Sequence, residues 1–370
     1  MTASPPRPPT PHPYRRRGRI ERIRGVLSGI RAVERTAWHT GELLHRRRSE
    51  NPTPGRRTPV DIGDRYAGGT VPEWPTDAPR APSRLTPAAG LTNPVLSAAD
   101  VTDFGVADCV ADPFLLPDGD TWHLFFEVYN HQREPTAAIA HAESDDGYEW
   151  TYDRVVLETD EHLSFPYVFR WDGEYYMVPD RWAKTRGVAG VTLYRAESFP
   201  HQWEPVADLV QPATDVHDFA PFRWDGRWWA LAGDGRDLYA YHSDTLEAEW
   251  EPHAGNPVVA DRRVAARPAG RPLVFADRIV VFLQDTAARY GERVRAYEVT
   301  TLSPEAYADR EQQGSPVLEP TGGLGWNSGA MHTVDPWYDG SGYLCAVDGT
   351  IGAGYQVFGD HHWAIGIYRG

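Results

Sequence analysis

Apolar residues alternate with turn residues and short polar segments through most of the chain, a pattern that predicts β-strands. The clearest example spans residues 111–127, where two apolar runs flank an Asp-Gly pair. Asp-Gly is a favoured turn in β-hairpins. The pattern therefore predicts a hairpin whose two ends carry the carboxylates of Asp112 and Glu127.

The same pattern returns in residues 165–180 without a gap. A shift of 53 positions aligns Pro113 with Pro166 and Glu127 with Asp180. An ungapped similarity of this length indicates an internal repeat, and the rest of the chain is best interpreted as further copies of that repeat.

Five such units can be recognised, and each predicts an inner hairpin followed by two more strands. They cover about residues 107–160, 162–211, 215–260, 266–320 and 326–370. Repeats of about 40–50 residues with four strands are typical of β-propellers. We therefore expect an all-β fold, a five-bladed β-propeller, in which a segment around 85–105 adds the strand that closes the ring. A pair of packed β-sandwiches is the alternative.

The N-terminal part of the chain follows another pattern. Residues 1–16 are rich in Pro and Arg, which indicates disorder. Between residues 17 and 46 apolar side chains recur every three or four positions with arginines between them, which predicts a basic amphipathic helix. Contact with a membrane surface or an acidic protein suits such a helix; packing on the acidic body of the chain, or a misassigned gene start, are the alternatives. We divide the chain into 1–60, a linker at 61–84, and the propeller at 85–370.

Charge is distributed unevenly over the 370 residues. The net charge of −15 combines +10 in residues 1–60, from fourteen Arg and four Glu, with −25 in the remainder, from 23 basic and 48 acidic residues. The basic residues are 36 Arg and a single lysine, Lys184. An acidic surface almost without lysine is typical of proteins from salt-accumulating archaea, so we expect a halophilic archaeal protein; a GC-rich genome alone is the other explanation of the Arg excess. The acidic body argues against a nucleic-acid partner.

Cysteine and hydropathy patterns restrict the compartment. Cys109 and Cys345 are too few for a disulfide framework or a metal site, so we expect two buried thiols in a reducing compartment; a disulfide between them is a weaker alternative. Neither a membrane-spanning run nor a secretion signal is present. These features predict a cytoplasmic protein that is peripheral at the membrane if the basic helix binds there.

The candidate chemistry lies where the propeller geometry brings strand ends together. We expect the inner strands to begin with Asp112, Asp218 and Asp335, and the next strands to deliver Glu127, Asp180 and Gln284 to the same end. Clustered carboxylates acquire different pKa values and can divide into acid and base, as glycosidic bond cleavage requires. The alternative is that these aspartates cap their own turns.

Further polar and aromatic residues fall at the same end of the predicted strands. An Arg there neutralises carboxylates or holds an anionic substrate group, and Gln and His suit sugar hydroxyls. The candidates for substrate binding are Glu127, His162, Tyr167, Arg267, Gln284, Asp285, His332 and Asp335. No ligand spacing specifies a metal site, neither a phosphate-binding loop nor a serine elbow is found, and we predict no cofactor.

Several of these segments resemble a known domain. They are Asp112-Pro113-Phe114 with Phe126-Glu127, residues 162–169, residues 267–270, Gln284-Asp285 and Tyr290-Gly291. Together they resemble the N-terminal domain of plant glucosamine inositolphosphorylceramide transferases over about residues 100–350. That family is similar in fold to the five-bladed propellers of glycoside hydrolase families 43, 32 and 68. The resemblance implies a carbohydrate-related role, and the transferase chemistry of the plant enzymes belongs to a separate C-terminal domain.

The hydrolase pattern implies roles for only some residues. Asp112 matches the general base of those enzymes, whereas blade two has Phe165-Pro166 in place of an expected Asp-Pro. Asp218 stands where a Glu acid is common, and Asp180 is the other candidate acid. We expect a glycoside hydrolase-like propeller that acts on a sugar or glycoconjugate, or alternatively a non-catalytic glycan-binding or scaffold propeller of glycoconjugate biosynthesis.

Overall fold

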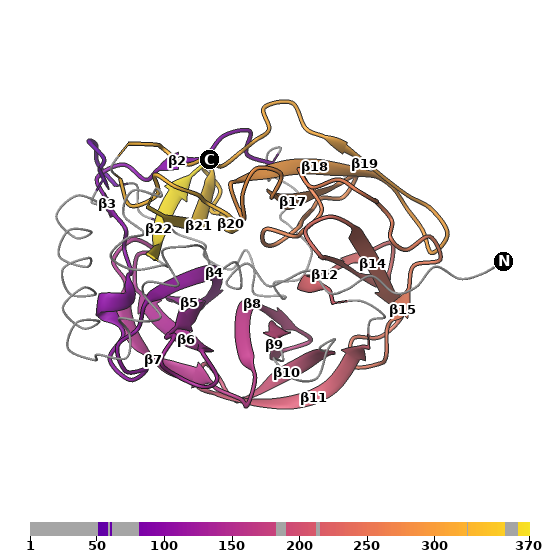
Figure 1. Ribbon diagram of the computed structural model, residues 1–370, viewed down its shortest axis with the longest axis horizontal. Coiled ribbons are helices and arrows are strands. Elements are labelled where there is room, and N and C mark those ends of the chain that lie inside the picture. The colour runs from indigo at the N-terminus through magenta and orange to yellow at the C-terminus, as the bar shows by residue number, and fades with distance from the viewer. Residues whose placement is uncertain are drawn as a thin grey trace, which may run out of the picture.

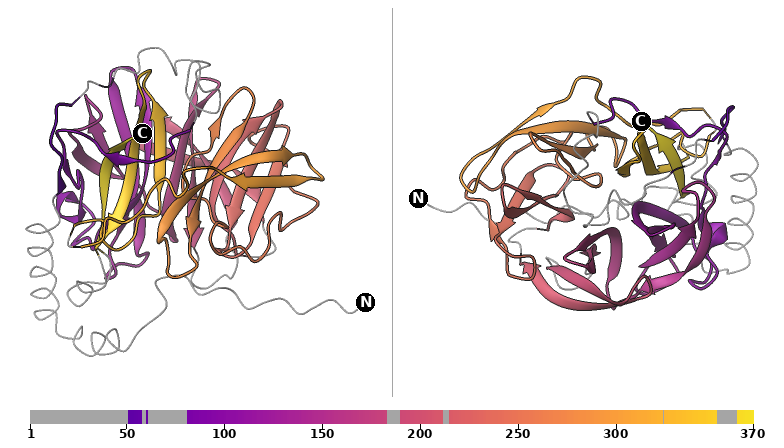
Figure 2. Two further views of the ribbon diagram at one scale, coloured as in Figure 1. Left: turned by 90° about the horizontal axis from the view of Figure 1, so that it is seen from above. Right: turned by 180° about the vertical axis from the view of Figure 1, so that it is seen from behind.

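The computed structural model describes residues 51–57, 60, 81–182, 190–211, 215–323, 325–351 and 362–370. Within them the chain forms five four-stranded sheets, which stand around a common axis (Figure 1). Seen from the side, many of the strands run roughly along that axis (Figure 2). The predicted all-β, five-bladed propeller is confirmed.

The first three blades are consecutive in the chain. Blade one contains β4 (Cys109–Asp118), β5 (Thr121–Tyr129), β6 (Ala137–Ser144) and β7 (Thr151–Leu157). Blade two contains β8 (His162–Trp171), β9 (Glu174–Trp182), β10 (Val191–Ser198) and β11 (Gln202–Val210). Blade three contains β12 (His217–Trp224), β13 (Arg227–Gly233), β14 (Leu238–Ser243) and β15 (Glu251–Pro252).

The last two blades complete the ring. Blade four contains β16 (Leu273–Val274), β17 (Ile279–Asp285), β18 (Arg293–Leu302) and β19 (Tyr307–Glu311). Blade five contains β20 (Val334–Tyr338), β21 (Tyr343–Thr350), β22 (Trp363–Arg369) and, from the other end of the chain, β2 (Thr86–Pro87). In Figure 1 the first strands β4, β8, β12 and β20 lie nearest the axis.

The ring is closed by the segment that precedes blade one. Thr86 pairs with Arg369 and Pro87 with Tyr368, so β2 becomes the outer strand of blade five. The buried side chain of Asn93 strengthens this junction, since its amide exchanges two hydrogen bonds with the backbone of Ile367 in β22. Closure by the N-terminal segment, which the sequence suggested, is confirmed. Two short elements accompany it, a pairing of β1 (Asn51–Pro52) with β3 (Thr92–Asn93) and a single 3₁₀ turn, η2 (Ala98–Asp100).

Burial follows the position of each strand in its blade. In blade one, β4 and β5 are buried almost throughout, and β4 packs against strands of both adjacent blades, whereas the outer strand β7 is exposed at Thr151 and Arg154. Continuous apolar runs in the inner strands and mixed patterns in the outer ones are the physical consequence.

Asp-Gly pairs form the predicted turns. In blade two, Asp172 and Gly173 link β8 to β9 and have φ of 52° and 86°; in blade three, Asp225 and Gly226 have φ of 50° and 76°. Two successive residues with positive φ make the type I′ turn that suits a hairpin. The carboxylates of these turn residues therefore serve local structure.

The inner strands of blades one to three share an irregularity. Asp112, Phe165 and Asp218 have φ of 52°, 46° and 59°, and the pairing register shifts by one residue beside each of them. Such left-handed bulges are costly for a side chain as large as that of Phe165, and strained positions of this kind gather at functional sites.

The middle of the ring is filled by a buried ion pair. Arg271 Nε donates to Asp335 Oδ1 at 2.7 Å, and its Nη2 donates to the carbonyl of Val168 at 2.8 Å. Its guanidinium carbon lies 4.8 Å from the ring centre of Tyr167. Asp335 and Tyr167, both expected to contact substrate, are 0% and 1% exposed and belong to this packed centre.

Three further expectations have different outcomes. Cys109 and Cys345 are both buried and free, as predicted, without a disulfide. Among the described residues, no helix is long and apolar enough to cross a membrane. The predicted basic helix at 17–46 lies outside the described residues.

Candidate functional site

Carboxylates are paired with basic side chains across successive blades at one end of the ring. Glu127 Oε1 of β5 forms an ion pair with His162 Nε2 of β8 at 3.2 Å. In the next pair of blades, Asp180 Oδ2 of β9 accepts a hydrogen bond from His217 Nδ1 of β12 at 3.0 Å. None of the four is more than 8% exposed. The second strand of one blade thus supplies a carboxylate to the histidine that begins the next blade.

The junction of blades three and four uses an arginine instead. Both guanidinium nitrogens of Arg267, Nε and Nη2, donate to the carboxylate of Asp218, the latter at 3.0 Å. Gln284 Nε2 adds a hydrogen bond to Asp218 Oδ2 at 2.9 Å. Burial lowers the pKa of Arg267, but the Asp218 carboxylate outweighs burial and raises that pKa well above its ordinary value. Both oxygens of the Asp218 carboxylate are therefore engaged as hydrogen-bond acceptors.

Asp112 lies where blades five, one and two meet. Its Oδ1 accepts a hydrogen bond from Thr333 Oγ1 at 2.7 Å, and its Oδ2 accepts one from the backbone nitrogen of Phe165 at 3.3 Å. Its own backbone nitrogen donates to Asp348 Oδ2 at 3.1 Å. The side chain is 5% exposed.

His332 connects Asp112 to Asp348. Its Nδ1 lies 2.7 Å from Asp348 Oδ2, and its Nε2 lies 3.7 Å from Asp112 Oδ1. The backbone nitrogens of His332 and Thr333 both donate to Asp348 Oδ1, at 3.0 and 2.9 Å. This arrangement fixes Asp348 and aligns the imidazole between two carboxylates.

Burial and charge shift the pKa values of this group. Burial raises the pKa of Asp112 to about 8, with Glu127 and Asp348 adding to the effect and His332 opposing it. Burial alone lowers the pKa of His332, but Asp348 and Asp112 outweigh it and bring that pKa to about 9. At neutral pH Asp112 is therefore protonated, or shares its proton with His332.

Aromatic side chains fix the other faces of His332. Trp363 stacks on the imidazole with ring centres 4.1 Å apart, and Tyr290 meets it edge-on at 5.1 Å. Gly291 has φ of 55°, and a Cβ at that position would lie 2.5 Å from the Cβ of His332. The close approach of the segment that carries Tyr290 thus requires glycine at position 291.

The structure brings most of the candidate residues to this end but places three elsewhere. Glu127, His162, Asp180, Asp218, Arg267, Gln284, Asp112 and His332 take part in the pairs described above. Asp335 and Tyr167 lie in the packed centre, and Asp285 accepts two hydrogen bonds from Arg295 of β18.

Sequence analysis missed Asp348, Thr333 and His217. Asp348 lies on β21, and Val334 to Tyr338 of β20 pair with Val347 to Tyr343 without interruption. The register of blade five shifts by one residue further from the turn, between the pairs Ala330–Thr350 and Val334–Val347. Aligning Asp335-Pro336 with Asp112-Pro113 therefore moved the predicted position along the strand. For His217 a signal existed, because it directly precedes Asp218, which was itself a candidate residue.

A metal ion is one ligand that the Asp112 end could be considered to hold. One donor atom from each of Asp112, His332 and Asp348 lies within 4.8 Å of the others. All four carboxylate oxygens of Asp112 and Asp348 also accept hydrogen bonds from the Thr333 hydroxyl or from backbone nitrogens, so we interpret the three residues as a proton-sharing group. Burial and neighbouring charges account for their properties.

Comparison with known proteins agrees with the resemblance inferred from the sequence. Residues 74–350 match the family model described as "Glucosamine inositolphosphorylceramide transferase 1, N-terminal". The chain belongs to this family. Relatives named glucosamine inositolphosphorylceramide transferase 1 include one from Arabidopsis thaliana, 31% identical over 274 residues, and one from Oryza sativa subsp. japonica, 30% identical over 270 residues. Each alignment covers 70% of this chain but 34% and 36% of the respective relative, so the chain spans about a third of their length.

Solved structures show the same fold in glycoside hydrolases. The catalytic domain of the GH62 alpha-L-arabinofuranosidase of Coprinopsis cinerea superposes with a TM-score of 0.55 and 13% identity, covering 78% of this chain and 98% of that domain. A family 117 glycoside hydrolase of Zobellia galactanivorans has a TM-score of 0.52 and 14% identity, covering 73% and 87%. At this level of identity the likeness concerns the fold.

Proposed function

We propose that the protein binds a sugar unit of a glycan or glycoconjugate at the end of the ring that carries Asp112, and that it cleaves or transfers a glycosidic bond there. The observation that carries this proposal is a pair of buried carboxyl groups, Asp112 and Glu127, in which burial raises the pKa of Asp112. Asp112 has a pKa of about 8, and Glu127, whose charge contributes to that shift, is ion-paired with His162. Two carboxyl groups with different protonation are the equipment of a glycosidase.

The environment of these residues supports a division of roles that differs from the sequence-based one. Asp112, expected as the base, is suited to donate its proton to the leaving oxygen, with His332 as the neighbouring proton reservoir. Glu127 is suited to act as base or nucleophile on the other side of the bond. Asp218, expected as an acid, has both carboxylate oxygens engaged by Arg267, which makes it unsuited to that role.

The proposal is tested with a panel of aryl glycosides that includes glucosaminides, galactosides and arabinofuranosides, at low and at molar salt. We expect the full chain to release the aryl group from at least one substrate. Replacement of the acid, Asp112→Asn, should lower the rate by roughly 10²–10⁴-fold. The matched control is Asp120→Asn, an exposed carboxylate at the other end of the same hairpin, which should leave the rate unchanged.

A non-catalytic role is the second candidate, and the Asp218–Arg267 pair favours it. A carboxylate locked in a bidentate ion pair at one of the expected catalytic positions suits a rigid recognition surface. Glycan binding without turnover of any panel member would establish the non-catalytic role. Absence of both turnover and glycan binding would overturn the carbohydrate proposal for this end of the ring.

A further inference from the structure

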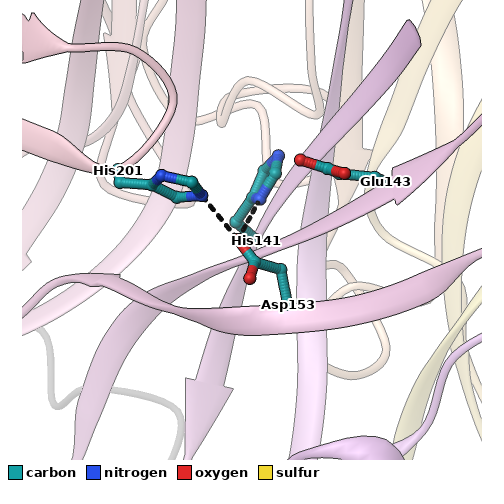
Figure 3. A group of neighbouring side chains, drawn as sticks. All are labelled: His141, Glu143, Asp153 and His201. Atoms are coloured by element: carbon teal, nitrogen blue, oxygen red, sulfur yellow. Dashed lines mark hydrogen bonds and ion pairs between the residues drawn. The ribbon is translucent and has the colours of Figure 1, made fainter.

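A second group of histidines and carboxylates lies between the first two blades, outside the site described above. His141 and Glu143 project from the same face of β6 because they are two residues apart. Asp153 comes from β7, and His201 from the turn between β10 and β11. One donor atom from each of the four lies within 4.8 Å of the other three (Figure 3).

Asp153 is the centre of this group. Its Oδ2 accepts hydrogen bonds from His141 Nδ1 at 3.1 Å and from His201 Nε2 at 2.7 Å (Figure 3). Its Oδ1 is occupied by Arg154 Nε at 3.1 Å. Two imidazole nitrogens from different blades thus face one carboxylate oxygen, and Figure 3 shows the exposed carboxylate of Glu143 pointing toward the His141 ring.

The buried imidazole of His141 has a partner behind it. His141 is 0% exposed, and its Nε2 lies 3.0 Å from Nδ1 of His123 on β5. The two imidazole rings also stack, with their centres 5.2 Å apart. A neutral imidazole whose second nitrogen is oriented by an outer partner is the form that metal ions bind.

We propose that His141, Glu143, Asp153 and His201 form a zinc site that joins the first two blades. Two imidazoles and two carboxylates are ligands that zinc accepts, and four protein ligands make a closed, structural site. The two carboxylates balance the charge of the ion, while Arg154 stays on the oxygen of Asp153 that faces away. When zinc binds, His141 loses the proton on Nδ1 and carries its proton on Nε2 instead, from which it donates a hydrogen bond to His123 Nδ1. His123 then carries its own proton on Nε2.

The geometry needs only a small adjustment. Four ligands about 2.0–2.2 Å from zinc lie roughly 3.4 Å from one another, so the most distant donors of the group, now within 4.8 Å, move together by roughly 1.4 Å at most. Glu143 is exposed and His201 lies in a turn, so both are free to make that movement. The two hydrogen bonds to Asp153 Oδ2 would then be replaced by bonds to the zinc ion from ligands of both blades.

The experiment uses the full chain, treated with a chelator and then titrated with ZnCl₂ by calorimetry and with CoCl₂ by visible absorption. We expect one ion per chain with the intense absorption of tetrahedral Co²⁺, and a Tm that rises by about 5 °C at a hundredfold excess of Zn²⁺ over Kd. Glu143→Gln and His201→Gln replace accessible ligands without touching the core, and each should weaken binding by roughly a hundredfold or more.

The matched control is His131→Gln. His131 is another histidine paired with an aspartate, since its Nδ1 lies 2.6 Å from Asp108 Oδ2, and its side chain is 30% exposed against 37% for His201. This variant should bind Zn²⁺ as the unaltered chain does. Absence of stoichiometric binding, or equal binding by Glu143→Gln and His201→Gln, would overturn the proposal, because the group would then be a hydrogen-bonded network or the ion would lie elsewhere.

Discussion

The backbone nitrogen of Phe165 donates a hydrogen bond to Asp112 Oδ2 at 3.3 Å, and the two residues occupy the same position in successive blades. Each stands at a left-handed bulge of an inner strand. Blade one is linked to blade five in the same way, since the backbone nitrogen of Asp112 donates a hydrogen bond to Asp348 Oδ2 of blade five. A carboxylate of one blade thus binds the bulge of the next blade, from blade five to one and from one to two, which couples the candidate site to the assembly of the propeller.

This coupling predicts that two replacements of Asp112 differ in stability. Asp112→Ala leaves the Thr333 hydroxyl and the Phe165 nitrogen without their acceptor and puts alanine at φ of 52°. We expect the free energy of unfolding to fall by about 2–4 kcal/mol. Asn tolerates positive φ and keeps an acceptor, so Asp112→Asn should cost about 1 kcal/mol. Urea denaturation of both variants provides the measurement, and equal losses would contradict a role for the bulge.

The Asp218–Arg267 pair predicts a non-additive double mutant. Both side chains are buried, at 1% and 7% exposure, so Arg267→Met alone leaves a buried unpaired carboxylate and should cost about 3–5 kcal/mol. Combining it with Asp218→Asn removes that charge and should restore much of the loss. A double-mutant cycle based on chemical denaturation measures the coupling. Additive effects would mean that the two side chains act independently.

The pKa values near Asp112 predict how stability depends on pH. The folded-state pKa of His332 is about 9 against an ordinary 6.5, and that of Asp112 is about 8 against 3.8. For each group, at pH values between its ordinary pKa and its folded-state pKa, the folded state holds more protons than the unfolded state. The free energy of unfolding therefore falls as pH rises through that interval. The stabilisation due to His332 is complete below pH 6.5 and is lost as pH passes 9.

The magnitude of this effect is about 3 kcal/mol, because each unit of pKa shift corresponds to about 1.4 kcal/mol. We expect the unaltered chain to lose that much more stability between pH 6.5 and pH 9 than His332→Gln does. Urea midpoints measured at several pH values provide the comparison. Parallel profiles for the two proteins would show that the imidazole is not the group that titrates.

Gly291 permits a test of packing against His332. Gly291→Ala brings a Cβ to within 2.5 Å of the His332 Cβ, and we expect it to lower stability by about 1–3 kcal/mol beyond the cost of positive φ and to reduce any turnover. Gly119 is the matched control, because its φ of 57° equals that of Gly291 within a few degrees and nothing lies within 4 Å of the added Cβ. A similar loss of stability in Gly119→Ala would show that the effect comes from the positive φ alone and not from contact with His332.

The basic N-terminal segment predicts attachment to anionic surfaces. We propose that residues 17–46 bring the acidic propeller to a membrane, as the charge of +10 in residues 1–60 supports. The full chain should sediment with phosphatidylserine vesicles at low salt, and a chain that begins at residue 51 should not. Molar salt should release it, because screening at that strength extends over only about 3 Å. Equal sedimentation of both chains would contradict the proposal.

The sequence by itself determined the blade. Its hairpin pattern recurs because each inner strand packs on both faces and each Asp-Gly pair needs a tight turn, and these local requirements appear directly as apolar runs and turn residues. The closing strand could be anticipated for a similar reason, since a ring of five sheets leaves the last one without an outer strand. The left-handed bulge was not visible, because an extra residue in a strand leaves its apolar pattern almost unchanged.

Tertiary structure decided which polar residues meet. Asp335 seemed equivalent to Asp112 by its following proline, yet the register shift of blade five lies before Val334, between the pairs Ala330–Thr350 and Val334–Val347. Asp335 therefore lies nearer the turn than this shift and binds Arg271 in the packed centre. The partner of each carboxylate, and with it the protonation of Asp112, depends on the contacts between blades, which join residues far apart in the chain and leave no local pattern.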